Sequence, residues 1–376
     1  TPVFSRGSSG TFVNANGLIV GKTTGTTVSI TPSSQAIGDE VNVIVPAGSV
    51  VGWVIGQPVS LIVDTDGQDD PDATELWLLG NIVSITLVSI SVTLLTFTVT
   101  SRTAQSGSAS SWTLGYRGPR FDHDPVTLAC KGLLIEEGRE NLIPFSEAFN
   151  DASWGKPSTG IAAAIVSPNQ GTAPDGQNTA DRIQFAASTA AAQEGHVWKV
   201  ATGGPRTGGS SVTASVWLRT ETGTATVYLS ITEGATGGTF TACSVTTTWT
   251  RFTVTRTLTA NAFVYMEIGP DTRASGANQP TAAGATVLVW GAQLEAGSFP
   301  TSYIPTPTSG TAARSADVCS ITGSDFSGFY NQSEGSLACN YSIITGFTGN
   351  RYAASIEDAL GGTQNGFTFR NTNSAT

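Results

Sequence analysis

The sequence predicts an all-β protein, built as a mosaic of several small β-sandwich or jelly-roll modules. Three observations lead to this fold class. Thr occupies 54 of the 376 positions, Gly occupies 43, and no long stretch carries apolar residues at helical spacing. Thr, Val and Ile favour pleated, half-buried strands, whereas Gly and Ser favour turns. A helical bundle is therefore excluded, and an α/β enzyme with long crossover helices is disfavoured.

Charged residues are scarce along the whole chain. Lys, Arg, Asp and Glu make up 12% of the sequence, about half of the ~25% found in ordinary soluble domains. The formal net charge of −10 disfavours a phosphate-binding surface, so we expect no nucleic-acid partner. A neutral Thr, Ser and Gly surface suits a subunit that is packed into a larger assembly, because few charges need desolvation at its interfaces.

The first module is predicted between residues 25 and 116. Residues 76–101 contain no charge and are long enough to cross a membrane as a helix. However, Ser and Thr alternate there with Val, Ile, Leu and Phe, which indicates strands and no membrane insertion. The alternation shifts phase at Leu87-Val88 and at Leu94-Leu95, where we predict bulges or turns. Strands are predicted at 27–30, 40–45, 58–63, 75–79, 82–87 and 95–99.

A second set of strands follows between Trp154 and Tyr303. The connections contain Gly, Asn and Pro, which suits a sandwich with Greek-key links. After a Pro, Ser and Thr linker, residues 319–376 begin a further β unit with too few strands to close a core. We expect the chain to continue, or neighbouring copies to complete this unit. Strands of the second set are predicted at 180–185, 196–200, 211–219, 224–232, 250–258, 263–268 and 286–294.

Several long strings resemble those of a known protein family. The strings are FSRGSSGTFVNANGLI, PRFDHDPVTLACKGLLIEEGRENLIPFSEAFNDASWGK, TAPDGQNTADRI, SVTASVWLRT, TTTWTRFTVT, VLVWGAQLEAGSFPTSYIPT and TAARSADV. In this order they resemble tailed-bacteriophage virion appendage proteins, the tail or head fibre or spike family. The central block is similar to a galactose-binding-like, carbohydrate-binding-module jelly roll. Residues 25–116 are similar to a small β module of phage fibres, and EGSLACNYSI is similar to the start of a concanavalin-like lectin domain.

This resemblance implies a domain order. An N-terminal anchor segment covers residues 1–24 and continues at 117–145, interrupted by the inserted β module at 25–116. The carbohydrate-binding-like jelly roll follows at 146–305. A linker at 306–318 precedes the incomplete lectin-like unit at 319–376. Insertion is tolerated where the two chain ends lie close together on a surface loop.

The same resemblance implies a non-enzymatic structural component of the virion, assembled in the bacterial host cytoplasm. Such a protein takes part in assembly and in attachment to host-surface polysaccharide, and fibre architecture implies a homotrimer. Its other partners would be phage virion proteins. Two alternatives stay open: a baseplate, collar or capsid decoration protein without receptor binding, and a polysaccharide depolymerase.

Aromatic side chains are the natural candidates for sugar contacts, because the apolar face of a pyranose stacks on an aromatic ring. Trp198 and Tyr228 are less constrained by the family strings than Trp217, Trp249 and Trp290, so they are the ligand-binding candidates. Trp154 is interpreted as a plug at the end of the sandwich. Core positions are predicted for Trp217, Trp249 and Trp290.

Acidic residues gather in the segment DTDGQDDPD at 64–72. The carboxylates of Asp64, Asp66, Asp69 and Asp70 are the hard oxygen ligands that Ca²⁺ prefers, although the segment fails the EF-hand pattern. The alternative is a solvated hairpin tip whose Asp and Gly residues serve the geometry of the turn. Calcium is the only cofactor considered.

Two further groups have the residue types of catalytic sites. Asp122, His123 and Asp124 lie in a row, but neighbouring strand residues point to opposite faces, so a structural turn is the preferred interpretation. Glycoside hydrolysis needs two carboxylates at a defined separation. Arg139, among Glu136, Glu137 and Glu140, is instead interpreted as an ion pair at the entry into the sandwich. We expect no catalytic residues.

The four cysteines have spacings of 113, 76 and 20 residues, which fit no zinc-knuckle or CxxC pattern. A disulfide between Cys319 and Cys339 would contribute ~3 kcal/mol in the chain-entropy model. The alternative is that all four are free and buried, as expected in a reducing cytoplasm.

Overall fold

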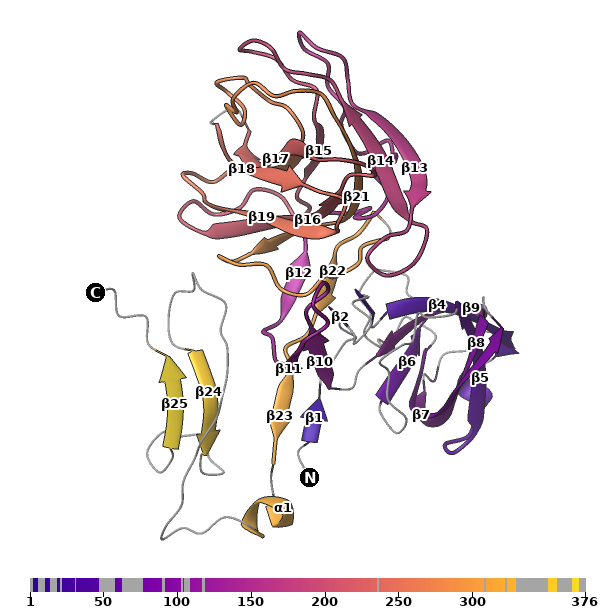
Figure 1. Ribbon diagram of the computed structural model, residues 1–376. Coiled ribbons are helices and arrows are strands. Elements are labelled where there is room, and N and C mark those ends of the chain that lie inside the picture. Colours follow the sequence, from indigo (N-terminus) through magenta and orange to yellow (C-terminus); the bar gives the residue numbers. More distant parts are fainter. Residues whose placement is uncertain are drawn as a thin grey trace.

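The protein is all-β in the computed structural model (Figure 1). Within the described residues, the exceptions are the 3-10 turn η1 (Pro32–Ser34) and the short helix α1 (Gly323–Ser327). No helix among these residues is long and apolar enough to span a membrane. The structure describes residues 3–5, 11–13, 19–20, 22–30, 32–46, 58–62, 77–89, 92–102, 104, 109–116, 119–234, 237–307, 309–321, 323–328, 351–356 and 367–371.

The inserted module is a closed six-stranded barrel and not a two-sheet sandwich. Among the described residues, its core contains Phe97 and otherwise aliphatic side chains, and Leu134, outside the barrel strands, packs against it. The strands are β4 (Lys22–Ile30), β5 (Glu40–Pro46), β6 (Pro58–Ile62), β7 (Trp77–Ser89), β8 (Val92–Arg102) and β9 (Ala109–Tyr116), and they close in the order β4-β5-β8-β7-β6-β9.

The two predicted phase shifts have different outcomes. The register between β7 and β8 shifts between Leu87 and Ser89, which confirms the first irregularity. At Leu94-Leu95 the prediction was wrong, because β8 runs through these residues in continuous register with β5. Leu94 is partly buried and Leu95 fully buried, so the barrel accommodates two successive apolar side chains without a bulge.

A set of short strand pairs, here called the neck, lies below the jelly roll in Figure 1. It joins the chain before the barrel to the chain after it, because β2 contacts β10. The pairs are β1 (Val3–Ser5) with β23 (Val318–Ser320), β2 (Phe12–Val13) with β3 (Ile19–Val20), β10 (Arg120–His123) with β11 (Cys130–Leu134), and β12 (Arg139–Asn141) with β22 (Ala312–Arg314).

Four buried charges hold the neck together. Arg120 is fully buried and pairs with Glu136 (Nη1 to Oε2, 2.7 Å) and with Asp317. Arg314 Nη1 lies 3.6 Å from Glu136 Oε2. Burial alone would raise the pKa of Glu136, but the two guanidinium groups and hydrogen bonds from Ser302 lower it to about 2. The four charges balance, as buried ions require.

The jelly roll consists of two antiparallel sheets that enclose one large apolar core. One sheet has the order β13-β14-β21-β16-β19 and the other the order β15-β20-β17-β18. The strands are β13 (Ile165–Gly171), β14 (Ala180–Phe185), β15 (Val197–Val200), β16 (Ser211–Arg219), β17 (Ala225–Glu233), β18 (Gly238–Val245), β19 (Thr250–Thr257), β20 (Val264–Ile268) and β21 (Ala285–Ala296).

Of the three tryptophans predicted at core positions, Trp217 and Trp290 are buried and Trp249 is only partly buried. Trp154 is 1% exposed, belongs to the main core and donates its indole N–H to the carbonyl of Phe145. Trp217 and Trp290 form a second apolar cluster with Tyr303, on the outer side of the five-stranded sheet. Trp249 is partly buried against this cluster. At the C-terminal end of the described chain, β24 (Arg351–Ile356) pairs with β25 (Phe367–Asn371).

Candidate functional site

The four-stranded sheet of the jelly roll has one side toward the core and one side away from it, here called the outer face. In β17, Val227, Leu229 and Ile231 belong to the core, so the alternate residues point to the outer face. Strand register then aligns one row of residues across that face. The row is Trp198, Glu267, Ser230 and Phe240, from β15, β20, β17 and β18.

Trp198 is half-buried and is held from two sides. The ring of Tyr265 meets it edge-on, with 5.4 Å between the ring centroids and 72° between the planes. Gly155 exchanges two backbone hydrogen bonds with Trp198, and a Cβ atom on Gly155 would overlap the indole ring. Glycine is therefore required at position 155 for the indole to occupy this place, and the ring is fixed before any ligand arrives.

Tyr228 lies on the same face, but it is 7% exposed and does not form an open platform. Its ring packs edge-on against Phe240, with 5.4 Å between centroids. It also lines a shallow hollow, together with Phe185, Gly269 and Pro270 among others. The structure therefore brings the two predicted residues to one face and separates them by Glu267 and Ser230.

The middle of the outer face is covered by the segment that links β20 to β21. Gln279 donates a hydrogen bond from Nε2 to Ser230 Oγ (2.7 Å) and accepts one from the backbone N–H of Asp271 (2.8 Å). Arg273 pairs with Asp271 (2.8 Å) and with Glu194 (2.6 Å). These contacts fix the segment on the sheet.

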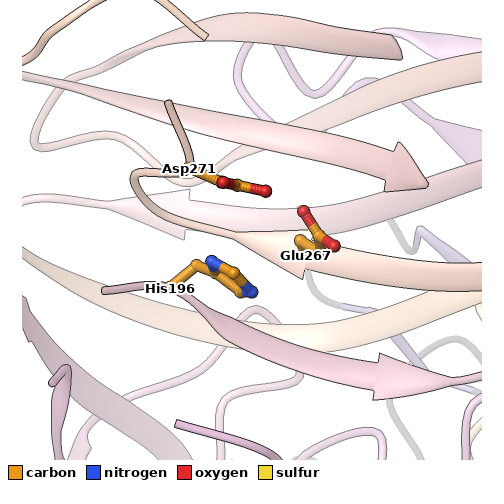
Figure 2. A group of neighbouring side chains, drawn as sticks. All are labelled: His196, Glu267 and Asp271. Atoms are coloured by element: carbon orange, nitrogen blue, oxygen red, sulfur yellow. The ribbon is translucent and has the colours of Figure 1, made fainter. Parts of the chain in front are cut away.

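Asp271 of this segment lies close to two buried side chains of the sheet beneath it, His196 and Glu267 (Figure 2). One ligand-type atom from each lies within 4.8 Å of those of the other two. Among the described residues, His196 Nδ1 and Glu267 Oε2 have no hydrogen-bond partner. Burial raises the pKa of Glu267 to about 7 and lowers the pKa of His196. The group has the donor atoms of a metal site or of a proton-sharing pair.

This cluster has no local sequence signature. Glu267 lies in the alternating strand pattern of β20, and His196 comes 71 positions before it, so spacing links neither residue to the other. In the sequence, the scarcity of histidine and the spacing of the cysteines argue against a metal site. In the fold, the register of β15 and β20 brings His196 close to Glu267, and the segment after β20 brings Asp271 close to both. One feature of the sequence could have indicated the site: Glu267 is a charged residue between Met266 and Ile268, two apolar residues that belong to the core.

The structure gives the other candidates ordinary roles. Asp124 accepts hydrogen bonds from the backbone N–H groups of Val126 (3.0 Å) and Thr127 (2.9 Å), which lower its pKa to about 2, so it closes a turn as interpreted. Asp122 and His123 instead lie on the strand β10, so the turn interpretation was wrong for these two residues. Arg139 pairs with Glu137, which confirms an ion pair at the entry into the sandwich.

Three predictions fall wholly or partly outside the described residues. Asp64, Asp66, Asp69 and Asp70 all lie outside them, so the calcium site stays a prediction. Cys319 is exposed on β23 and Cys339 lies outside the described residues, so the disulfide also stays a prediction. The prediction that all four cysteines are buried was wrong, because Cys130 and Cys319 are exposed. Cys243 is buried, and burial raises the pKa of its thiol to about 12.

No family model matches the sequence, and no curated protein matches it. Among solved structures, the chain is similar to the enzymatically active domain of bacteriophage CBA120 tailspike protein 4, at 10% identity and a TM-score of 0.30. The match covers 42% of this chain and 21% of that chain.

Two carbohydrate-binding modules are similar over the same share of the chain. TmCBM61 in complex with β-1,4-galactotriose matches at 11% identity and a TM-score of 0.29, covering 41% of this chain and 97% of that one. The CBM22-1 xylan-binding domain of Paenibacillus barcinonensis Xyn10C matches at 10% identity and a TM-score of 0.29, covering 43% and 97%. With TM-scores of 0.30 or below, none of these likenesses bears on the function of this chain.

Proposed function

We propose that the protein is a non-catalytic structural subunit of a tailed-phage virion that attaches to host-surface glycans through the outer face of its jelly roll. The ordered strings that resemble phage appendage proteins support the virion role. The observation that supports glycan binding is the fixed, half-buried indole of Trp198.

Trp198 has the properties of a sugar platform. An indole is a large apolar surface that stacks on the apolar face of a pyranose. Because Tyr265 and Gly155 already fix the ring, little side-chain entropy is lost when a sugar binds. Single contacts of this kind are weak, but several copies on one particle multiply them into firm attachment.

Replacing Trp198 by Ala is expected to weaken binding to host-surface polysaccharide at least tenfold, because the stacking surface is lost. Binding of the purified full chain is measured on a glycan array and then by titration with the best sugar. Trp249→Ala is the matched control: Trp249 is also partly buried, but it lies on the outer side of the five-stranded sheet and should leave binding unchanged.

Other results would point to the alternatives. If the wild-type chain binds no glycan at millimolar sugar, attachment is wrong, and a scaffold role in the baseplate, collar or capsid is favoured. If reducing ends are released from the polysaccharide, the protein is a depolymerase.

The neck has features of an assembly surface. In the β10–β11 hairpin, Phe121 is 49% exposed and lies directly opposite Leu133, which is 40% exposed. Ile135, on the same side of the chain as Leu133, is 50% exposed. Clustered apolar side chains of this size usually mark an interface. We propose that copies of the same chain cover them, in a homotrimer as in phage fibres.

The double variant Phe121→Ser, Leu133→Ser is expected to shift the protein from trimer to monomer, because the apolar contact between copies is removed. Sedimentation velocity at several concentrations measures the change. Ile165→Ser is the control, since Ile165 is 61% exposed on β13, away from the hairpin. A wild-type chain that stays monomeric at high concentration would contradict the homotrimer.

A further inference from the structure

We propose that His196, Glu267 and Asp271 bind one divalent transition-metal ion of the Zn²⁺ type. The inference does not depend on glycan binding, since it concerns buried residues beneath the outer face. His196 precedes β15, Glu267 belongs to β20, and Asp271 lies in the turn after β20 (Figure 2). One ion would thus link two neighbouring strands and the segment that covers them.

The first argument is the presence of free donor atoms. Buried polar atoms are almost always hydrogen-bonded, yet His196 Nδ1 and Glu267 Oε2 have no partner among the described residues. Both side chains are at least nine-tenths buried, with exposed fractions of 1% and 5%. Glu267 is oriented by Thr232, whose hydroxyl donates to Oε1 (2.6 Å).

The second argument is charge. Glu194, Glu267 and Asp271 contribute three carboxylates, and among the described ion pairs Arg273 is the one cation that contacts them. With all three ionised, the group carries two uncompensated negative charges in a largely buried place. A divalent cation balances them, and buried charges need such compensation.

The donor set selects the kind of ion. Imidazole nitrogen with carboxylate oxygen suits Zn²⁺ and its first-row neighbours, whereas Ca²⁺ needs six to eight oxygen ligands. Zinc bonds to nitrogen and oxygen are about 2.0–2.2 Å long and tetrahedral, so two donors on one ion lie about 3.4 Å apart. The donors here lie within 4.8 Å, and rotation of the Glu267 side chain closes the remaining gap.

Asp271 is the most constrained of the three ligands. Its Oδ1 accepts from the Arg273 backbone N–H (3.1 Å) and Nε (2.8 Å), and its Oδ2 accepts from Arg273 Nη2 and from the Ala277 N–H (3.0 Å each). Binding an ion would replace one of these bonds. His196 and Glu267 are therefore the decisive ligands, and water completes the coordination shell.

The test uses the full chain freed of metal with a chelator. Isothermal titration with Zn²⁺ is expected to show one equivalent per chain, and saturating Zn²⁺ should raise the melting temperature of the jelly roll by about 5–10 °C. Ca²⁺ at the same concentration should do neither. Co²⁺ should give a visible spectrum without the thiolate charge-transfer band, which shows that cysteine is not a ligand.

His196→Gln and Glu267→Gln are each expected to lower the affinity for Zn²⁺ at least 100-fold. Both replacements are polar and of similar size, and Glu267→Gln keeps an oxygen for Thr232, so the fold should persist. His123→Gln removes the other histidine of the chain and should leave binding unchanged. Replacing the exposed Cys130 and Cys319 by Ser should also leave it unchanged.

The proposal is overturned if the wild-type chain takes up no stoichiometric Zn²⁺. It is also overturned if uptake survives in both glutamine variants or disappears in the serine variant, since the ion would then be held elsewhere. Loss of Zn²⁺ binding with unchanged glycan binding would separate this site from the proposed attachment function.

Discussion

Replacing Arg120 by Ala is expected to destabilise the neck by about 3–5 kcal/mol, because removal of one partner leaves buried carboxylates without compensation. Arg120 is fully buried, and its guanidinium also donates to the carbonyl of Thr11 (2.8 Å) and the hydroxyl of Ser302 (2.9 Å). It therefore connects the chain before the barrel, the neck and the end of the jelly roll. Scanning calorimetry and hydrogen exchange of residues 120–141 measure the loss.

Two variants serve as controls for Arg120. Arg182 forms an ion pair with Glu221 at 2.7 Å, but the side chains are 34% and 43% exposed. Arg182→Ala should therefore cost less than about 1 kcal/mol. The combined variant Arg120→Met, Arg314→Met, Glu136→Gln, Asp317→Asn removes all four buried charges together and should recover much of the stability. A loss below about 1 kcal/mol for Arg120→Ala alone would contradict a stabilising role for this cluster.

Acid sensitivity offers a second measure of the same cluster. The pKa of Glu136 falls from its usual 4.5 to about 2 in the folded protein. A carboxyl group whose pKa is lower in the folded than in the unfolded state stabilises the fold at pH values above its unfolded-state pKa. For Glu136 this contribution is lost as the pH falls from 4.5 to about 2. Arg120→Ala removes one of the two cations responsible, so the variant should lose less stability than the wild type between pH 4.5 and 2.

Replacing Trp154 by Ala is expected to destabilise the jelly roll by about 3–5 kcal/mol, since it empties a large volume in a closed core. The ring lies 4.7 Å from that of Phe149 between centroids, and the Lys199 ammonium lies 5.8 Å from it. The melting temperature of the jelly roll should fall by about 10 °C, as measured by scanning calorimetry.

Trp198→Ala is the matched control for Trp154. The two residues are near neighbours through Gly155, but Trp198 is only half-buried. We expect Trp198→Ala to lower the free energy of unfolding by less than about 1.5 kcal/mol, because the Trp198 ring buries less apolar surface than the Trp154 ring. Equal losses of stability in Trp154→Ala and Trp198→Ala would contradict the prediction that Trp154 contributes more to the core than Trp198.

The strands of the jelly roll were largely predictable, because its antiparallel sheets bury one face and leave a two-residue period. The strands at 180–185 and 211–219 agree residue for residue with β14 and β16. Two strands of the jelly roll were missed. β13 is mostly exposed and contains Pro168, which is typical of an edge strand, and β18 follows a Gly-rich stretch.

The site was less predictable than the strands. Trp198 could be selected because it stood outside the family strings. The closure of the inserted module into a barrel depends on pairings between distant strands, which no local pattern specifies. Likewise, His196 and Glu267 meet only through the register of β15 and β20, and Asp271 only through the path of a loop. Long-range register is the information that spacing along the chain does not contain.

The first and last strands of the barrel are direct neighbours, with Lys22 of β4 opposite Gly115 of β9. If this segment were unfolded, the neck would have to close a loop of roughly 100 residues, at an entropy cost of about 4 kcal/mol. The folded barrel holds its own two ends together and removes that cost. Folding of the barrel and closure of the neck are therefore thermodynamically coupled, even though the neck interactions described above lie outside the barrel strands.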